Sequence, residues 1–439
     1  MTFPSDFIFG AATSAYQIEG ATGRGRSIWD RFCDQPGNIA DGSNGDVACD
    51  HVHRWQSDVE LMAGMNLNGY RFSFAWPRLF PQGNQQSNAQ GFDFYDQLID
   101  TLLQKGITPY ATLYHWDLPE SLGDQGGWLN RDTPYRFAEF AEQVVNRFGD
   151  RVQHWATLNE PRCAAFVGHL EGRHAPGLKS IASALQAAHH MLLGHGLAIQ
   201  SINRKDLDLG IVLDIKPYYP STASADAQKA AQQGDGVFNR WFFDAVLKGQ
   251  YPEDIWLGFA EDVPEVLESD MSIINAPISS LGVNYYTRSL VEWDGEAPFP
   301  NVKPVKNPQG RYTTMDCEIF PEGLEAMLVR LNEDYSLPNL YVAETGAALA
   351  DQLENGQVHD PLRIQYLNGH LKAVANARKQ GVPVTGYFNW SLMDNFEWGH
   401  GFTQRFGLVY VDYANQKRYV KSSGRWFAEF IAEQQLTTA

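Results

Sequence analysis

Two glutamates stand where apolar, strand-like runs end, a position from which a carboxylate can take part in chemistry. The run over residues 340–343 leads to Glu344, and Gly346 permits a sharp change of direction just beyond it. The run over residues 152–158 leads through an asparagine to Glu160, and a proline follows at once. Both acids are therefore expected at the rim of a fold rather than in its core.

Hydrophobic periodicity predicts the elements that must position these two acids. Apolar residues that alternate or run together predict strands, and apolar residues three and four apart predict helices between them. The predicted strands cover residues 7–10, 69–74, 107–113, 152–158, 209–213, 278–286, 340–343 and 383–392. The predicted helices lie around residues 55–62, 95–102, 137–148, 181–202, 237–245, 364–374 and 426–430. Asp360 and Pro361 are predicted as the N-cap and first residue of the helix at 364–374.

This alternation predicts an α/β fold, a single (β/α)8 TIM barrel with long βα loops that forms one domain over residues 1–439. The active site of such a barrel lies at the carboxyl ends of its strands. An open, doubly wound sheet is the alternative, but the glycine-rich first turn that it needs is absent. The stretch over residues 291–316, rich in Pro and Gly, is expected to be a long functional loop.

The composition excludes several classes of partner. The 439 residues carry a net charge of −18, and a field of that sign repels nucleic acid and anionic membranes. The four cysteines lie far apart, without a C-x-x-C pair, and are expected to be free thiols in the cytoplasm. No secretory leader or membrane-spanning run is recognisable. An oligomer is compatible with the sequence.

Neither a metal nor a cofactor is expected. His51 and His53 resemble half of a metal site, but no further ligand stands at a suitable spacing, and the start of a polar helix is the better interpretation. Arg24 and Arg26 lie in a glycine-rich loop that lacks the pattern of a phosphate-binding loop.

Two carboxylates facing each other across a barrel mouth suit the cleavage of a glycosidic bond. One acid protonates the leaving oxygen while the other attacks or stabilises the anomeric carbon. Glu160 and Glu344 end the fourth and seventh predicted strands, which lie on opposite sides of a barrel. The plain alternative is that each is an ordinary acid at a strand end. That alternative is weakened because both acids are delivered to the same rim.

Several motifs in order along the chain resemble those of family 1 glycoside hydrolases, which include β-glucosidases, β-galactosidases and 6-phospho-β-glycosidases. FIFGAATSAYQIEG at residues 7–20 is similar to the N-terminal signature of that family, and TLNEP at 157–161 to its acid/base motif. The further similar segments are GYRFS at 69–73, YHWD at 114–117, NYY at 284–286 and WSLMDNFEW at 390–398. The resemblance covers essentially the whole chain.

The resemblance implies a retaining β-glycosidase, most simply a β-glucosidase, acting without a cofactor on small β-glycosides or short oligosaccharides. It assigns Glu160 as the general acid/base and Glu344 as the nucleophile, supported by Arg71 and Tyr286. The residues that it implies for binding the sugar are Gln17, His115, Trp116, Asn159, Asn284, Tyr286, Trp390, Glu397, Trp398 and Phe406. Cys163 and His174 are expected on the side of the leaving group.

Other interpretations stay open at this point. Arg71 and His115 could be structural groups, and Trp390 and Trp398 could simply belong to the core. A 6-phospho-β-glycosidase is one alternative function, although the carboxylate of Glu397 would repel a phosphate. A non-catalytic sugar-binding relative is another. Where the family commonly has Thr-Glu-Asn-Gly, this chain has Ala-Glu-Thr-Gly over residues 343–346, so the hydrogen bonds beside Glu344 are expected to differ.

Overall fold

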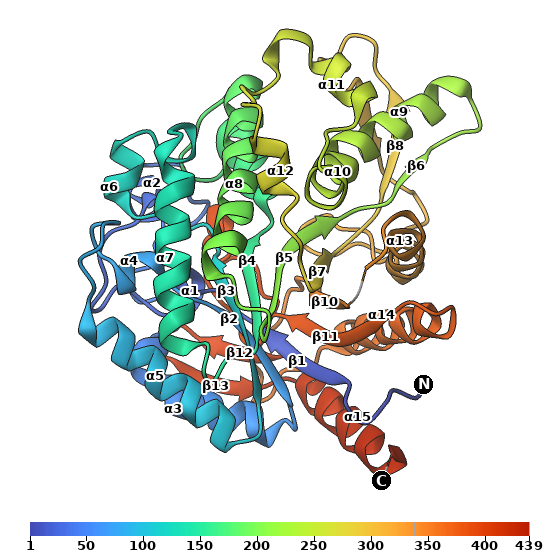
Figure 1. The fold of residues 1–439 in the computed structure, drawn as a ribbon. Coiled ribbons are helices and arrows are strands. Elements are labelled where there is room, and N and C mark those ends of the chain that lie inside the picture. The colour runs from blue at the N-terminus through green and yellow to red at the C-terminus, as the bar shows by residue number, and fades with distance from the viewer. Residues whose placement is uncertain (338, 439) are drawn as a thin grey trace.

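A closed barrel of eight parallel strands forms the centre of the computed structural model, which describes residues 1–337 and 339–438. The strands are β1 (Ile8–Ala12), β2 (Gly69–Ser73), β3 (Thr108–Tyr114), β4 (His154–Asn159), β5 (Asp208–Ile215), β7 (Ser280–Tyr285), β10 (Leu340–Thr345) and β11 (Val384–Trp390). Their order around the barrel is β1-β11-β10-β7-β5-β4-β3-β2 (Figure 1). The (β/α)8 prediction is confirmed, and each predicted strand overlaps one strand of the barrel.

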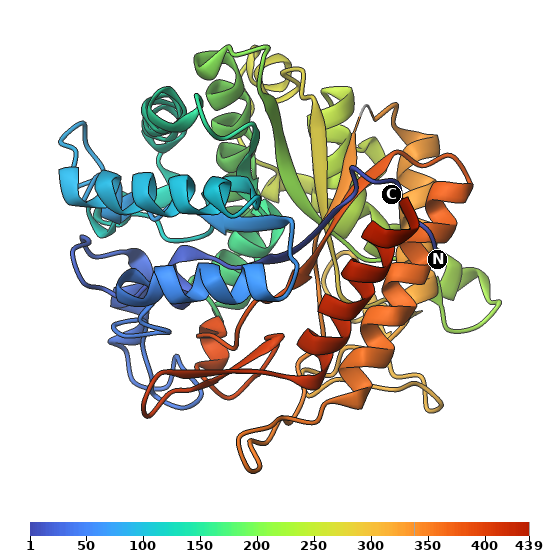
Figure 2. The ribbon, with the colours of Figure 1, turned by 90° about the horizontal axis from the view of Figure 1, so that it is seen from below.

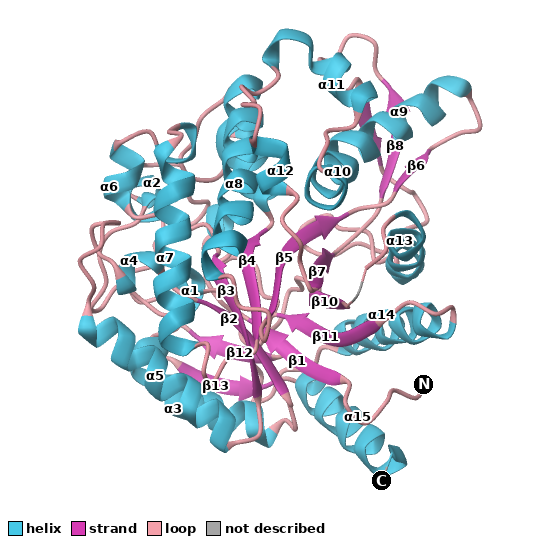
Figure 3. Ribbon diagram, viewed as in Figure 1, coloured by secondary structure: helices cyan, strands magenta, loops and turns pink. Residues whose placement is uncertain are grey.

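Helices surround the strands on the outside of the barrel (Figure 3). The longer ones are α3 (His51–Gly64), α5 (Ala89–Gln104), α7 (Asp132–Phe148), α8 (Ile181–Ile202), α9 (Ala225–Asp235), α10 (Trp241–Lys248), α13 (Pro321–Asp334), α14 (Pro361–Lys379) and α15 (Ser422–Thr438). Shorter ones are α1 (Ala15–Ile18), α2 (Ile28–Cys33), α4 (Trp76–Leu79), α6 (Glu120–Asp124), α11 (Glu253–Phe259) and α12 (Asp270–Ile274). As predicted, His51 begins a helix, and α8 has the predicted bounds. Both views place the chain ends on one side of the molecule (Figure 2).

The apolar spacing of α7 explains how a helix attaches to this barrel. Its predicted stripe, which includes Phe137, Val144 and Phe148, is fully buried against α8 and the strands. The opposite face carries charged residues such as Arg147, which pairs with Asp96 of α5. Burial of one stripe therefore fixes the rotation of α7 on the barrel.

The predicted loop over residues 291–316 is partly a sheet. β8 (Ser289–Trp293) and β9 (Val302–Val305) pair antiparallel, and β6 (Tyr218–Pro220) joins β8 to give three strands. This small sheet packs on α9 through a separate apolar cluster. The helix predicted at 237–245 is also interrupted, because a π-helix, η3 (Gly236–Arg240), precedes α10. A further hairpin joins β12 (Val409–Asp412) and β13 (Lys417–Val420).

One extra residue interrupts β10 just before Glu344. Val342 pairs with Val283 of β7, but the next pair joins Glu344 to Asn284, so Ala343 has no counterpart. Tyr341 and Ala343 lie inside the barrel and Val342 lies in the outer core with the helices. Strict alternation would turn Glu344 outward. The bulge instead turns Glu344 into the barrel mouth and leaves Thr345 to bond Tyr366 of α14.

A buried ionic cluster fixes the start of α15 to the barrel loops. Lys421 Nζ lies 2.5 Å from a carboxylate oxygen of Asp351 and 2.6 Å from one of Asp394. Arg363 of α14 lies 2.8 Å from Asp351 and also pairs with Asp360. Asp360 precedes α14 as predicted, but its side chain makes no N-cap hydrogen bond to that helix because it is engaged by Arg363. Within the described ranges, no helix is long and apolar enough to cross a membrane.

Candidate active site

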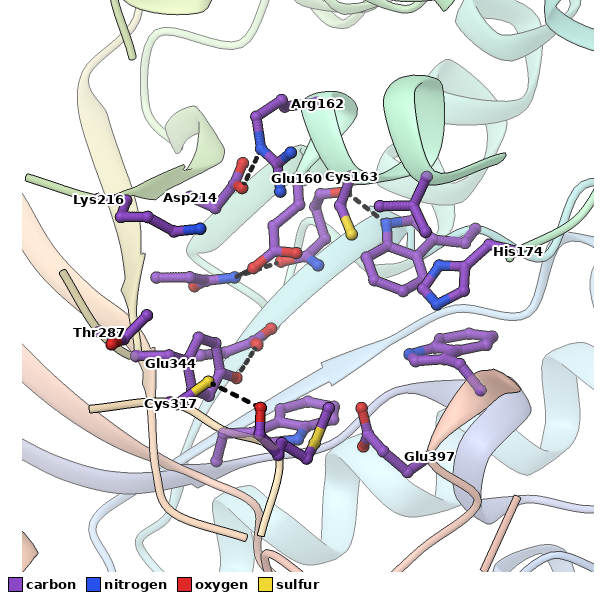
Figure 4. A pocket seen from close by; sticks show the side chains of 18 of the residues that line it. Glu160, Arg162, Cys163, His174, Asp214, Lys216, Thr287, Cys317, Glu344 and Glu397 are labelled. Carbon is purple, nitrogen blue, oxygen red and sulfur yellow. Dashed lines mark hydrogen bonds and ion pairs between the residues drawn. The ribbon is translucent and has the colours of Figure 1, made fainter. Parts of the chain in front are cut away.

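A cavity of about 300 Å³ opens at the carboxyl ends of the barrel strands. Glu160, which directly follows β4, and Glu344 of β10 both line it, and Figure 4 shows their side chains directed toward its interior. Both side chains are largely buried, with 7% and 3% of their residue surfaces exposed. The two glutamates singled out in the sequence therefore lie in one enclosed space.

Glu344 is held by two strong hydrogen-bond donors. Arg71 of β2 places Nη1 2.5 Å from Oε1, and the Tyr286 hydroxyl donates to Oε2 at 2.7 Å. Burial raises the pKa of Glu344, and Arg71 and then Tyr286 oppose that rise. Gly346 is needed beyond it, because a Cβ there would stand 1.7 Å from the carbonyl oxygen of Trp390. The carboxylate is thus fixed, oriented and partly neutralised.

Glu160 has a different environment. It follows β4 with a φ of 46°, a conformation that costs free energy in a residue with a side chain and that often marks functional sites. Its Oε1 accepts a hydrogen bond of 2.7 Å from the Asn284 amide. Burial, then Asp214, then Glu344 raise its pKa well above the ordinary value. These surroundings favour a proton on Glu160.

Asn159 connects three other polar groups of the site. Its Oδ1 accepts from Arg71 at 2.7 Å and from Asn284 at 3.1 Å, while its Nδ2 donates to His115 Nε2 at 3.1 Å. Burial and Arg71 lower the pKa of His115 well below its ordinary value, so the ring is neutral and carries its hydrogen on Nδ1. That Nδ1 is buried and finds no acceptor among the described residues, so it can donate to a bound hydroxyl.

Glu397 and the aromatic side chains close another side of the cavity. Burial and then Glu344 raise the pKa of Glu397 to about 8. Gln17 donates to Glu397 at 3.4 Å and to the carbonyl of Phe396 at 2.8 Å. Trp398 stands in an aromatic cluster, 4.7 Å from Trp116 between ring centroids. This wall therefore offers ring faces beside hydrogen-bonding groups, a combination that suits a sugar.

Comparison with known proteins gives one consistent result. The model of glycosyl hydrolase family 1 matches residues 1–436. The chain belongs to glycosyl hydrolase family 1. It is 43% identical to "Beta-glucosidase A" of Acetivibrio thermocellus, over 98% of each chain. A β-glucosidase from Thermotoga maritima in complex with glucoimidazole superposes with a TM-score of 0.96 and 43% identity, covering 99% of each chain. A family 1 β-glucosidase from Exiguobacterium antarcticum gives a TM-score of 0.97 at 41% identity, over the full length of both.

Most of the side chains expected from the resemblance to family 1 line this cavity. They are His115, Trp116, Asn159, Glu160, Asn284, Tyr286, Glu344, Trp390, Glu397, Trp398 and Phe406, together with Cys163 and His174. Arg71 and Gln17 do not line it. Arg71 lies behind Glu344 and Asn159, and Gln17 lies behind Glu397, so each contacts the cavity through another side chain.

Sequence reasoning missed part of the cavity wall. Arg162, Asp214, Lys216, Thr287, Met315 and Cys317 also line the cavity. Asp214 carried the same signal that singled out the glutamates, because it stands where the apolar strand β5 ends. Arg162 lies in the helical turn that leads into a π-helix and Cys317 lies in a loop, and neither segment has a periodicity that shows which way a side chain points.

The departure from the usual family 1 motif has a local explanation. Ala343 is the bulged residue and its methyl group packs inside the barrel with Tyr341. The Thr345 hydroxyl bonds the Tyr366 hydroxyl at 2.9 Å, away from the cavity. Neither side chain binds the Glu344 carboxylate, which keeps Arg71 and Tyr286 as its partners.

Proposed function

We propose that this member of family 1 is a retaining β-glucosidase that uses Glu344 as its nucleophile and Glu160 as its general acid and base. This assignment rests on a difference between the two buried carboxyl groups of the cavity in their hydrogen-bond partners and in their pKa. Glu344 is bound by a guanidinium and a phenol, whereas Glu160 has the more strongly raised pKa. β-Glucosidase names and glucoside-mimicking inhibitors among close relatives agree with this function.

The first step forms a covalent glycosyl-enzyme. A Glu344 oxygen attacks the anomeric carbon as the bond to the leaving oxygen breaks, and the proton of Glu160 passes to that oxygen. The Glu344 charge is thereby consumed in an ester. Because that charge helps to keep Glu160 protonated, its loss lowers the pKa of Glu160.

The second step regenerates the enzyme. Glu160, now ionised, takes a proton from water while the water oxygen attacks the anomeric carbon. The ester bond to Glu344 breaks and its carboxylate returns to Arg71 and Tyr286. Two inversions give a product of retained β configuration.

Two other functions are less well supported. Glu397 and Trp398 stand in the region where phospho-specific members of the family carry Ser and Lys, so a 6-phosphoglycoside would meet a carboxyl group instead of a cation. A sugar-binding protein without catalysis has no need of two buried glutamates in one cavity. Turnover of a chromogenic β-glucoside, without turnover of its 6-phosphate, would separate these functions.

We further propose that residues 1–439 act as one catalytic domain, in the cytoplasm, on small β-glucosides or short β-linked oligosaccharides. The four cysteines are free, in agreement with a reducing compartment. The strong negative charge argues against nucleic acid and anionic membranes as partners.

Replacement of the nucleophile tests the mechanism. Glu344→Gly is expected to lower turnover of aryl β-glucosides by more than roughly 10⁴-fold, because no covalent intermediate can form. Azide fits the space left and is expected to restore turnover of activated substrates with formation of an α-glucosyl azide. Recovery of a β-azide, or no rescue, would contradict the role of Glu344. Asp214→Gly is the control, and azide is not expected to rescue it through an α-product.

A further inference from the structure

One cation of the cavity wall has no carboxylate partner. Three Lys or Arg side chains line the cavity, namely Arg162, Arg173 and Lys216. Arg162 lies 2.5 Å from Asp214, and Arg173 lies 2.5 Å from Glu171. No described residue forms an ion pair or side-chain hydrogen bond with Lys216 Nζ. The wall therefore carries an uncompensated positive charge in a chain whose net charge is −18.

Lys216 is held by neighbouring residues at both its backbone and its side chain. Its backbone N–H donates to Asn239 Oδ1 at 3.1 Å, and its carbonyl accepts from Asn239 Nδ2 at 2.8 Å. Its Nζ lies 4.5 Å from the ring centroid of Phe238, and the Arg162 guanidinium lies 3.9 Å from the same centroid. Asn239 and Phe238 both belong to η3. The lysine is thus ordered before any ligand arrives, which lowers the cost of binding one.

Lys216 stands on the side of the cavity where a leaving group would lie. It follows β5 directly after Ile215, two residues beyond Asp214, and Asp214 raises the pKa of Glu160. Figure 4 shows Lys216, Asp214 and Arg162 grouped beside Glu160, with Glu397 on the far side of Glu344. If Glu160 protonates the leaving oxygen, groups on its side meet the leaving group, whereas Glu397 meets the sugar.

The described residues supply no anionic partner for the ammonium group of Lys216, so a ligand could supply one. Burial lowers the pKa of Lys216, which means that its charged form is poorly solvated and would gain from a negative partner. His174 and His400, which also line the cavity, have lowered pKa values and stay neutral, so they do not compete for the anion. A carboxylate or sulfate on the leaving group would receive a charge-assisted hydrogen bond.

On the basis of the proposed function, we propose that Lys216 is a specificity-determining residue that selects β-glucosides whose leaving group carries an anionic substituent. The substrate class is one in which a carboxylated or sulfated aromatic or sugar alcohol is released. The sugar itself is bound elsewhere in the cavity, so the preference concerns the leaving group alone.

The test compares 4-carboxyphenyl β-D-glucoside with its neutral carboxamide. The ratio of kcat/KM for the two substrates is expected to fall by roughly five- to tenfold in Lys216→Met relative to the unmodified enzyme. Lys216→Arg should keep most of the preference. The matched control is Lys229→Met, because Lys229 also lies over an aromatic ring, 4.1 Å from Trp293, but does not line the cavity. The difference in leaving ability between the substrates cancels, since it is the same in every variant.

Salt provides a second measurement that needs no variant. The carboxylate-to-carboxamide ratio of kcat/KM for the unmodified enzyme should decline when NaCl is raised from about 20 mM to about 500 mM, because salt screens the attraction between Lys216 and the anionic substrate as it approaches the cavity. A ratio that is unchanged by both salt and Lys216→Met would overturn the proposal. Absence of turnover with the carboxamide itself would instead refute the β-glucosidase function, so the two failures are distinguishable.

Discussion

At the scale of single residues, the neighbours of each carboxyl decide its chemistry. Glu160, Glu344 and Glu397 are the same residue type in one cavity, yet their surroundings differ. Glu344 has a guanidinium and a phenol, Glu160 has one amide near another carboxylate, and Glu397 has weak donors in an apolar wall. A strand ending in an acid could be recognised in the sequence. The partners that tune each acid come from distant strands, so hydrophobic periodicity cannot find them. The resemblance to family 1 implied Arg71 and Tyr286 for Glu344, but it gave no sign of Asp214 beside Glu160.

The acid role of Glu160 makes a prediction about leaving groups. In Glu160→Ala, kcat/KM for alkyl β-glucosides should fall by about 10²- to 10⁴-fold, because a poor leaving group needs the proton. Dinitrophenyl β-glucoside, whose leaving group departs without a proton, should lose about tenfold or less. Steady-state kinetics with both substrates measure this. Equal losses would show that Glu160 acts in some other way.

The raised pKa of Glu397 makes a prediction about stability. Its pKa is about 8 in the folded protein, against 4.5 ordinarily, so the folded state retains a proton that the unfolded chain loses. The contribution of Glu397 to the free energy of unfolding therefore falls as pH rises between those values. Glu397→Gln mimics the protonated acid and lacks this loss, so its Tm advantage over the unmodified enzyme should grow by a few degrees when the pH is raised from 5 to 8. Thermal unfolding measures this, with the exposed Glu354→Gln as control. A gain equal at both pH values would rule out this explanation.

At the scale of elements, periodicity predicted more than irregular structure did. The apolar residues of α8 gave both of its bounds, and the apolar stripe of α7 gave its end at Phe148 but not its start at Asp132, which lies before the stripe. The strands β8 and β9 were missed because they lie outside the barrel, half-exposed, in a stretch rich in Pro and Gly. The two π-helices, η2 (Cys163–Glu171) and η3, shift the register of the side chains that they carry toward the cavity.

The ionic cluster at the start of α15 makes a prediction at this scale. Lys421→Met would leave the carboxylates of Asp351 and Asp394 buried without this cation, and should destabilise the protein by about 3–5 kcal/mol. Asp394 stands close to Glu397 in the chain, so KM for aryl β-glucosides should also rise. Chemical unfolding and kinetics measure the two effects. The matched control is Lys306→Met at the exposed Lys306–Asp316 pair, which should change stability by less than about 0.5 kcal/mol. Similar losses in both variants would contradict the prediction.

At the scale of the whole molecule, the barrel could be predicted because its eight strands and their intervening helices must repeat along the chain. The same topology explains why residues as far apart in sequence as Arg71 and Glu344 meet at one rim. Because the barrel is closed, the carboxyl ends of its strands meet at one rim and bring the side chains of the cavity together. Their individual roles stay predictions until the kinetic experiments are done.

The extra residue in β10 has a consequence for evolution and design. Ala343 shifts the in–out alternation of the side chains along β10 by one residue. The direction of the Glu344 side chain is therefore set by one inserted residue rather than by the geometry of a regular barrel. An extra residue also interrupts the pairing of β4 with β5 shortly before Glu160. Transplanting these glutamates onto a regular, idealised barrel would therefore aim them into the helix layer. A designer has to copy the two irregularities along with the two acids.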